Sequence, residues 1–165
     1  MPRTISRSEA LELLGRQRRA DGCLLCALRD GELGSPLLIA ESEHTVVLLP
    51  RYATRWGHLM VVLRRHVTTF AELSDEAWRE ATTLALAAAR TIEATLSPLR
   101  CYVASLGAPR GDLPMTSPHL HLHVIPIYDH DDKPATVLTW SNGVLVADEP
   151  EWEALRQQLR DAWPT

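Results

Sequence analysis

Three histidines alternate with apolar residues in the segment "HLHLHV" at residues 119–124. Successive side chains of a β-strand point to opposite faces, so this spacing predicts that His119, His121 and His123 share one face while the apolar residues face the core. Exposed filler on a half-buried strand is one interpretation. Imidazole is not among the side chains that strands favour, however, and its repetition at alternate positions favours a functional site.

Such a row of imidazoles suits two kinds of chemistry. Neighbouring side chains on one strand face are about 7 Å apart and the outer pair is about 13 Å apart, so two of the three can converge on one metal ion but all three cannot. In the second kind, a neutral imidazole attacks the substrate while its neighbour donates to a developing anion. Imidazole titrates near neutrality, so both of its forms are available at pH 7. The pattern alone leaves both interpretations open.

A second group of reactive side chains is the C-x-x-C pair Cys23 and Cys26. No apolar run approaches the length of a membrane span, and the N-terminal residues lack the apolar centre of a secretion signal, so the sequence predicts a cytoplasmic protein. In a reducing compartment such a pair indicates metal ligands or a redox pair rather than a disulfide framework. Two small core residues are the alternative.

The composition is that of an ordinary globular chain. The 165 residues are 45% hydrophobic and 23% charged, with a net charge of −4, so we expect a single domain and neither nucleic acid nor a membrane as partner.

The elements that must position these side chains follow from periodicity and from turn residues. The pattern predicts a mostly antiparallel five-stranded sheet with one long helix and a C-terminal helix, an α+β fold. Strands are expected at residues 37–41, 44–50, 57–67, 100–107 and 119–128, and helices at Thr4–Ala20, 75–96 and Pro150–Trp163. The Pro- and Gly-rich segment "GAPRGDLPMTSP" predicts an irregular loop beside the histidines.

Three segments together resemble a known family. "HLHLHV" resembles the H-φ-H-φ-H-φ motif of the histidine-triad (HIT) superfamily of nucleotide hydrolases and transferases, where φ is an apolar residue. "RWGHLMVVLRRH" is similar to that family's glycine-histidine strand, and "CLLC" stands where its zinc-bearing members carry a cysteine pair. The resemblance covers most of residues 23–128, between an N-terminal helical extension at 1–22 and a C-terminal tail and helix at 129–165.

The resemblance implies a role for each matching residue. His121 would attack the α-phosphorus of a dinucleoside polyphosphate or nucleoside phosphoramidate and form a nucleotidyl-histidine intermediate. His123 would donate to the phosphate oxygens, His58 would support the same site, and Thr116 and Ser117 would supply further donors.

The same resemblance implies a structural zinc ion and a homodimer. The zinc ligands would be Cys23, Cys26, His66 and His119. Two thiolates and two imidazoles complete a tetrahedral set with no open position for water, which is typical of structural zinc.

Two positions depart from the family pattern. Pro50 stands where many members hold the ribose with Asp or Asn, and Met115 stands where a phosphate-binding Gln is common. Proline has neither a side-chain acceptor nor an amide hydrogen, so ribose and 2′-deoxyribose should be poorly distinguished unless another group, such as Glu43 or a C-terminal residue, has taken the role. Two other functions therefore stay open: a nucleotide-binding sensor of the same fold, and a metal-dependent enzyme that uses two triad histidines.

Overall fold

A five-stranded antiparallel sheet organises the molecule. The computed structural model describes residues 2–17, 22–107 and 117–164. The strand order is β2-β3-β4-β6-β5, and every neighbouring pair is antiparallel. The strands are β2 (Leu38–Glu41), β3 (Thr45–Leu48), β4 (Leu59–Leu63), β5 (Arg100–Ala104) and β6 (His121–Ile127). This architecture confirms the predicted α+β fold.

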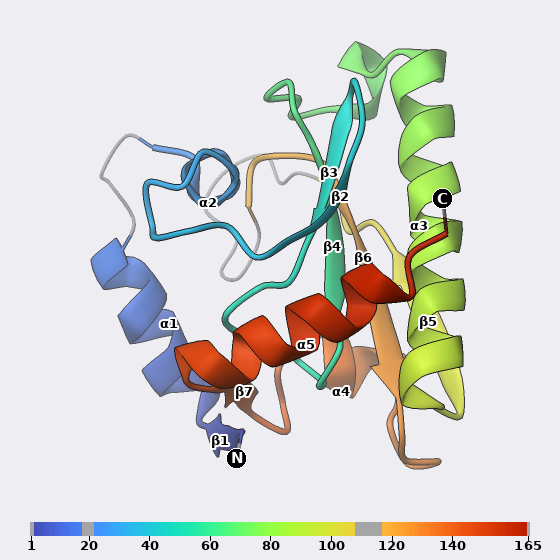
Figure 1. The fold of residues 1–165 in the computed structure, drawn as a ribbon. Coiled ribbons are helices and arrows are strands. Elements are labelled where there is room, and N and C mark those ends of the chain that lie inside the picture. Colours follow the sequence, from blue (N-terminus) through green and yellow to red (C-terminus); the bar gives the residue numbers. More distant parts are fainter. Residues whose placement is uncertain (1, 18–21, 108–116, 165) are drawn as a thin grey trace.

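Helices cover both faces of the sheet. Figure 1 shows the sheet nearly edge-on, with α3 on one side and α1 and α2 on the other. The helices are α1 (Arg7–Gln17), α2 (Leu24–Arg29), α3 (Asp75–Leu96), α4 (Pro134–Leu138) and α5 (Glu149–Asp161), with a short 3₁₀ turn, η1 (Phe70–Glu72).

The long helix α3 lies close against the sheet because small residues form its buried face. Ala81, Ala85 and Ala88 are almost fully buried there. The Ser74 hydroxyl caps its N-terminus by accepting the Ala77 N–H at 3.2 Å. Helix α5 packs against β2 and α3, and its buried Trp152 joins the same core. This core occupies one face of the sheet, and the candidate functional side chains lie on the opposite face.

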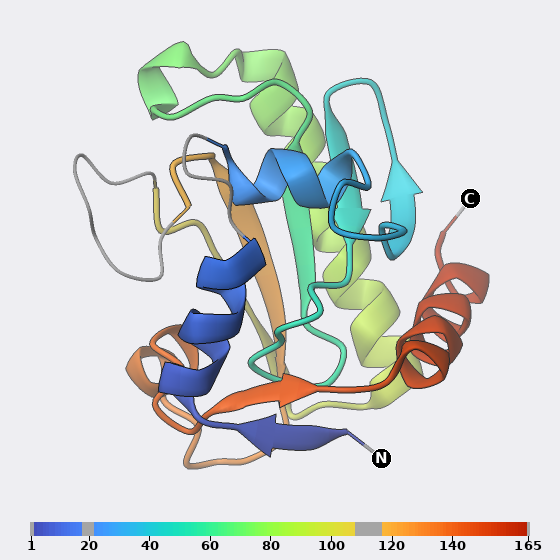
Figure 2. The same cartoon turned by 90° about the vertical axis from the view of Figure 1, so that its left-hand side faces the viewer.

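A small second sheet ties the N-terminus to the C-terminal part of the chain. Strand β1 (Arg3–Ile5) pairs antiparallel with β7 (Val144–Val146), as Figure 2 shows at the lower edge of the molecule. Gly143 has a φ of 86°, and a Cβ there would lie 2.7 Å from the Ile5 carbonyl oxygen, so only glycine fits this turn.

The predicted N-terminal helix, Thr4–Ala20, begins three residues before the observed start of α1. Thr4 belongs to β1, and α1 begins at Arg7 because the Ser6 hydroxyl accepts the Glu9 N–H at 3.1 Å and ends the extended segment. Residues 18–21, the end of the predicted helix, lie outside the described part of the chain.

Candidate active site and metal centre

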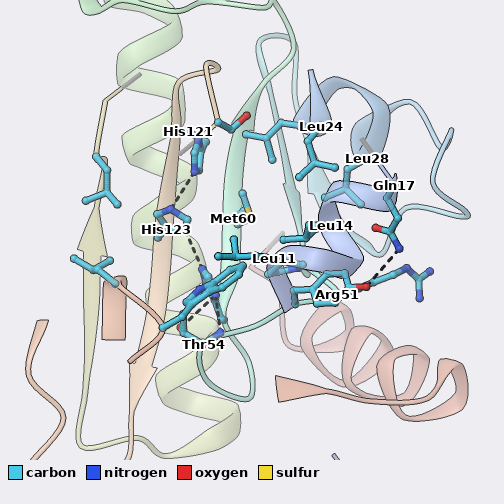
Figure 3. A pocket seen from close by; sticks show the side chains of 18 of the residues that line it. Leu11, Leu14, Gln17, Leu24, Leu28, Arg51, Thr54, Met60, His121 and His123 are labelled. Atoms are coloured by element: carbon cyan, nitrogen blue, oxygen red, sulfur yellow. Dashed lines mark hydrogen bonds between the residues drawn. The ribbon is translucent and has the colours of Figure 1, made fainter. Parts of the chain in front are cut away.

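A cavity of about 270 Å³ lies on the sheet face opposite α3. Its floor comes from β4 and β6, and its sides come from α1 and α2 (Figures 2 and 3). Three histidines, His58, His121 and His123, line it together with mainly apolar side chains. The cavity thus brings together all three residues that were predicted to be catalytic.

Strand β6 presents its histidines to this cavity by ordinary alternation. Leu122 and Val124 point into the main core, whereas His121 and His123 pair with Val62 and Met60 on β4 and face the other way. The third histidine departs from the predicted pattern. His119 precedes β6 rather than lying in it, and its side chain is completely buried instead of lining the cavity.

The cavity histidines form a continuous chain of hydrogen bonds. Nδ1 of His121 lies 2.7 Å from the His119 carbonyl oxygen, and its Nε2 lies 3.0 Å from Nε2 of His123. Nδ1 of His123 lies 3.0 Å from Nε2 of His58. Nδ1 of His58 faces the backbone N–H and the hydroxyl of Thr54, each at 3.5 Å.

The contact at the His119 end of this hydrogen-bond chain determines which nitrogen of each ring carries the proton. A carbonyl oxygen only accepts, so Nδ1 of His121 carries the hydrogen and its Nε2 carries a lone pair. His123 must then donate from Nε2, and the same logic makes His58 donate to His123 and accept from Thr54. Each ring is a neutral tautomer, and the unprotonated Nε2 of His121 is available as a nucleophile.

Burial favours these neutral forms. It lowers the pKa of His58 to about 3, with a further contribution from His121. It also lowers the pKa of His123 well below its usual range, where His58 and His121 add to the effect. The pKa of His121 is lowered by burial as well, against the opposing effect of the His119 carbonyl.

Local backbone geometry explains the glycine before His58. Gly57 has a φ of 87°, and a Cβ at this position would clash with the Leu96 side chain of α3. The tight turn ends with the His58 N–H bonded to the Arg55 carbonyl oxygen at 3.1 Å. The turn places the His58 ring, which is only 3% exposed, within hydrogen-bond distance of His123.

A second cluster lies at the other end of the histidine segment. It contains the four predicted zinc ligands, Cys23, Cys26, His66 and His119, and their ligand atoms all lie within 4.8 Å of one another. Nδ1 of His119 is 3.4 Å from the sulfur atoms of both cysteines, and Nδ1 of His66 is 3.5 Å from Cys26. Tetrahedral zinc with its usual bond lengths separates sulfur and nitrogen ligands by about 3.5 Å. The donor set fits that ion.

The His119 ring is already in the tautomer that a metal requires. Its Nε2 lies 2.8 Å from the Leu63 carbonyl oxygen, so Nε2 carries the hydrogen and Nδ1 faces the cysteines with a lone pair. Burial and the neighbouring Cys23 raise the pKa of the Cys26 thiol to about 11. A bound cation would have the opposite effect, since metal ligation requires the thiolate.

The predicted substrate-binding residues are only partly described. Ser117 lines the cavity beside His121, whereas Thr116 and Met115 lie outside the described residues. Pro50 also lines the cavity.

Sequence reasoning missed one whole wall of the cavity. Leu11, Leu14 and Gln17 of α1 line it, together with Tyr52 and Trp140. Of these residues, the sequence singles out only Trp140, as an aromatic side chain that could stack on a base or pack in the core or at its rim. The helix residues carried no pattern beyond ordinary amphipathicity, because their role depends on where β1 docks.

Arg51 and Arg55, which precede β4, are engaged in ion pairs. Arg55 binds the buried Asp132, with Nε to carboxylate oxygen at 2.7 Å, and Arg51 binds Glu149 with one contact at 3.0 Å. Asp132, one of the acidic residues that follow β6, therefore has a structural partner.

The family model of the HIT domain matches residues 35–130 of the chain. An uncharacterized HIT-like protein of Mycoplasma genitalium is 29% identical over 108 residues, which cover 65% of this chain and 74% of that protein. A 16.1 kDa HIT-like protein of Mycoplasma pneumoniae, also uncharacterized, is 27% identical over 110 residues, or 66% of this chain and 74% of the relative.

Solved structures share the fold. A zinc-bound histidine triad family protein from Mycobacterium smegmatis superposes with a TM-score of 0.65 at 22% identity, covering 86% of this chain and 92% of that one. A hypothetical histidine triad nucleotide-binding protein from Sulfolobus tokodaii gives 0.65 at 19% identity, with 85% and 91% covered. Diadenosine triphosphate hydrolase from Plasmodium falciparum gives 0.60 at 11% identity, with 75% and 74% covered. Among the described helices, none has the length and apolar character needed to cross a bilayer.

Proposed function

The chain belongs to the HIT domain family, and from this premise we propose that it is a nucleotide hydrolase or nucleotidyl transferase with His121 as its nucleophile. The observation that carries the proposal is the pair of contacts from which the tautomer of His121 is assigned. Its Nδ1–H is bound to the His119 carbonyl oxygen at 2.7 Å, and its Nε2 lone pair faces the cavity next to a hydrogen-bond donor.

The first half of the reaction forms a covalent intermediate. Nε2 of His121 bonds to the α-phosphorus, the bond from phosphorus to the leaving group breaks, and the leaving group departs with the electron pair. The nucleotidyl-imidazole gains positive charge, which the His119 carbonyl oxygen stabilises through Nδ1–H. In the second half, water attacks the same phosphorus, and the P–N bond breaks with its electron pair returning to Nε2 of His121. A proton of the attacking water passes to solvent, and a nucleoside monophosphate is released.

His123 acts as a donor to the phosphate. Its Nε2–H, which contacts His121 at 3.0 Å, would turn to a phosphate oxygen when the substrate occupies the cavity. Because the His58 N–H holds Nδ1 of His123, the donating nitrogen stays the one that faces the phosphate. A preoriented donor at the point where negative charge grows lowers the barrier.

Zinc belongs to the same proposal as a structural ion. Cys23, Cys26, His66 and His119 would hold it, joining α2 and the end of β4 to the start of β6. Its chemistry there is to fix the fold locally, since four protein ligands leave no position for substrate.

Two other functions are candidates for this chain. A nucleotide-binding protein with little turnover is the second candidate, because Pro50 in the cavity wall offers no acceptor to a sugar. A metal enzyme built on two triad histidines has less support. Within the described residues, the one group of three or more possible metal ligands contains a single triad histidine, His119.

A second copy of the chain is the proposed macromolecular partner. Strand β5 is one edge of the sheet, and Val103 on it and Tyr128 just beyond β6 are large apolar side chains with 51% and 40% exposure. An uncovered edge flanked by apolar groups favours pairing with another chain.

The decisive experiment is a substrate screen. The purified protein should be incubated with diadenosine polyphosphates and adenosine 5′-phosphoramidate, and the products separated by chromatography. Release of adenosine monophosphate by the native chain, and its loss in His121→Ala, supports the proposal. No product from any substrate, together with binding of adenosine monophosphate, would favour the nucleotide-binding protein.

A further inference from the structure

One wall of the cavity comes from a segment outside the family match. The HIT match begins at residue 35, whereas α1 spans residues 7–17 and contributes Leu11, Leu14 and Gln17 to the lining. Figure 3 shows His121 and His123 at one side of the pocket, Gln17 at the other, and Leu11, Leu14 and Met60 between them.

Contacts outside the cavity hold the N-terminal segment that contains α1 in place. Strand β1 pairs with β7 over three residues, and buried Ile5 and Ala10 pack with Val144 in a separate small cluster. Trp140 packs against that cluster and lines the cavity, with its backbone held at a φ of 59°. Left-handed geometry at a residue with a bulky side chain costs free energy, and such residues concentrate at functional sites.

A polar pair closes the end of the cavity farthest from the histidines. The side-chain amide of Gln17 donates to the Tyr52 hydroxyl at 3.5 Å, the outer limit for a hydrogen bond. Among the described residues, the Gln17 side-chain oxygen has no hydrogen-bond partner. Arg51, the neighbouring cation, is bound to Glu149 and to the Ser35 carbonyl oxygen. Gln17 and Tyr52 are therefore the groups that can turn to a ligand.

The pair has the chemistry of a site for two adjacent hydroxyl groups. An amide offers one acceptor and two donor hydrogens, and a phenol can donate and accept, so together they match a vicinal diol. The apolar surfaces of Leu14, Leu24 and Leu28 lie on both sides of the same part of the cavity and suit the flat faces of a nucleobase.

We infer that α1 completes the nucleoside half of the site, and that Gln17 and Tyr52 bind the ribose hydroxyls. This inference rests on the proposed nucleotide function, and it supplies the sugar contact that Pro50 cannot make. Glu43, the alternative considered from the sequence, does not line the cavity. Of the two side chains that would bind the sugar, Gln17 lies outside the residues 35–130 that match the family, and Tyr52 lies within them.

Product binding tests the inference directly. Adenosine 5′-monophosphate and its 2′-deoxy and 3′-deoxy analogues should be titrated into the native chain and into Gln17→Leu and Tyr52→Phe by calorimetry. The native chain should prefer the ribonucleotide about tenfold for each hydroxyl bound. In Gln17→Leu, the ratio of the affinity for the ribonucleotide to that for at least one deoxy analogue should fall close to one. The reason is that only the affinity for the ribonucleotide decreases.

Glu12→Gln is the matched control. Glu12 lies on the same helix but pairs with Arg16 and does not line the cavity, so its replacement should leave both ratios unchanged. If Gln17→Leu and Tyr52→Phe both keep the affinity ratios of the native chain, the inference is overturned while the nucleotide function stays intact. A changed preference between adenine and guanine nucleotides, with unchanged sugar ratios, would also overturn it. If the native chain binds none of the nucleotides and releases no product, the proposed function fails too.

Discussion

The Nε2 atoms of His121 and His123 lie 3.0 Å apart, and only one of them carries a hydrogen. The direction of that contact is set from outside the pair, by the His119 carbonyl oxygen at one end and by the backbone N–H of Thr54 at the other. The imidazole with the free lone pair and the imidazole with the donor hydrogen are thereby assigned before any substrate binds.

The first prediction concerns the covalent role of His121. His121→Ala should lower turnover by several orders of magnitude, because it removes the attacking atom itself. Acid-quenched native reactions should carry an acid-labile nucleotidyl group on a peptide spanning residues 117–128, detected by mass spectrometry. His130→Ala is the matched control, since this exposed histidine is not part of the cavity lining and its loss should leave turnover unchanged. Near-native activity in His121→Ala would rule out the mechanism.

The second prediction separates the donor role of His123 from its packing. His123→Ala removes an oriented donor and should lower kcat by about 10²–10³-fold with a smaller change in KM. His123→Gln keeps an N–H near the same place and should recover part of that loss. Steady-state kinetics on one substrate measure both. Equal kcat in the Ala and Gln variants would mean that the hydrogen bond contributes little.

The third prediction is one tightly bound zinc ion per chain. Cys23→Ser should lower the zinc content and the Tm together, because the free energy of metal binding is part of the free energy of folding. Elemental analysis of protein purified without added metal, with thermal unfolding alongside, measures both. Cys101→Ser provides the control, because Cys101 lies on β5 and is not a member of the cluster. Little zinc in the native chain, unchanged in Cys23→Ser, would identify the two cysteines as packing residues.

The fourth prediction is a loss of stability in acid that originates at His58. Burial depresses the pKa of this ring to about 3 in the folded chain, so the unfolded chain, with its pKa near 6.5, binds the proton more readily. The free energy of unfolding must therefore decrease as the pH falls below about 6.5. His58 alone should account for about 2 kcal/mol between pH 7 and pH 5.

Urea unfolding at the two pH values measures that contribution. His58→Asn lacks the titrating ring, so its stability should fall less between pH 7 and pH 5 than that of the native chain. An identical pH dependence in the two proteins would show that the ring is not held neutral by folding.

The sequence predicted the large elements correctly because each carries its own periodic signal. Strands β2 to β6 are apolar runs between turn residues, and α3 and α5 have clear caps and amphipathic patterns. The four members of the metal cluster were also named in advance, from the family resemblance, and the structure brings them together.

The remaining features depend on long-range packing that local sequence does not encode. Strands β1 and β7 have three residues each and exist because they pair with each other across most of the chain. The cavity wall formed by α1 follows from that pairing. His119 was placed on the strand by the regular alternation, but its ring is drawn to the cysteines, and the strand begins two residues later.

His119 links the candidate metal centre to His121, the proposed nucleophile. Its ring faces the two cysteines while its own carbonyl oxygen fixes the proton of His121, so one residue anchors both sites. An ion that never touches substrate would then determine whether the attacking nitrogen is correctly presented. The supply of zinc would set the fraction of competent molecules, and depletion of the metal would imitate a mutation in the active site.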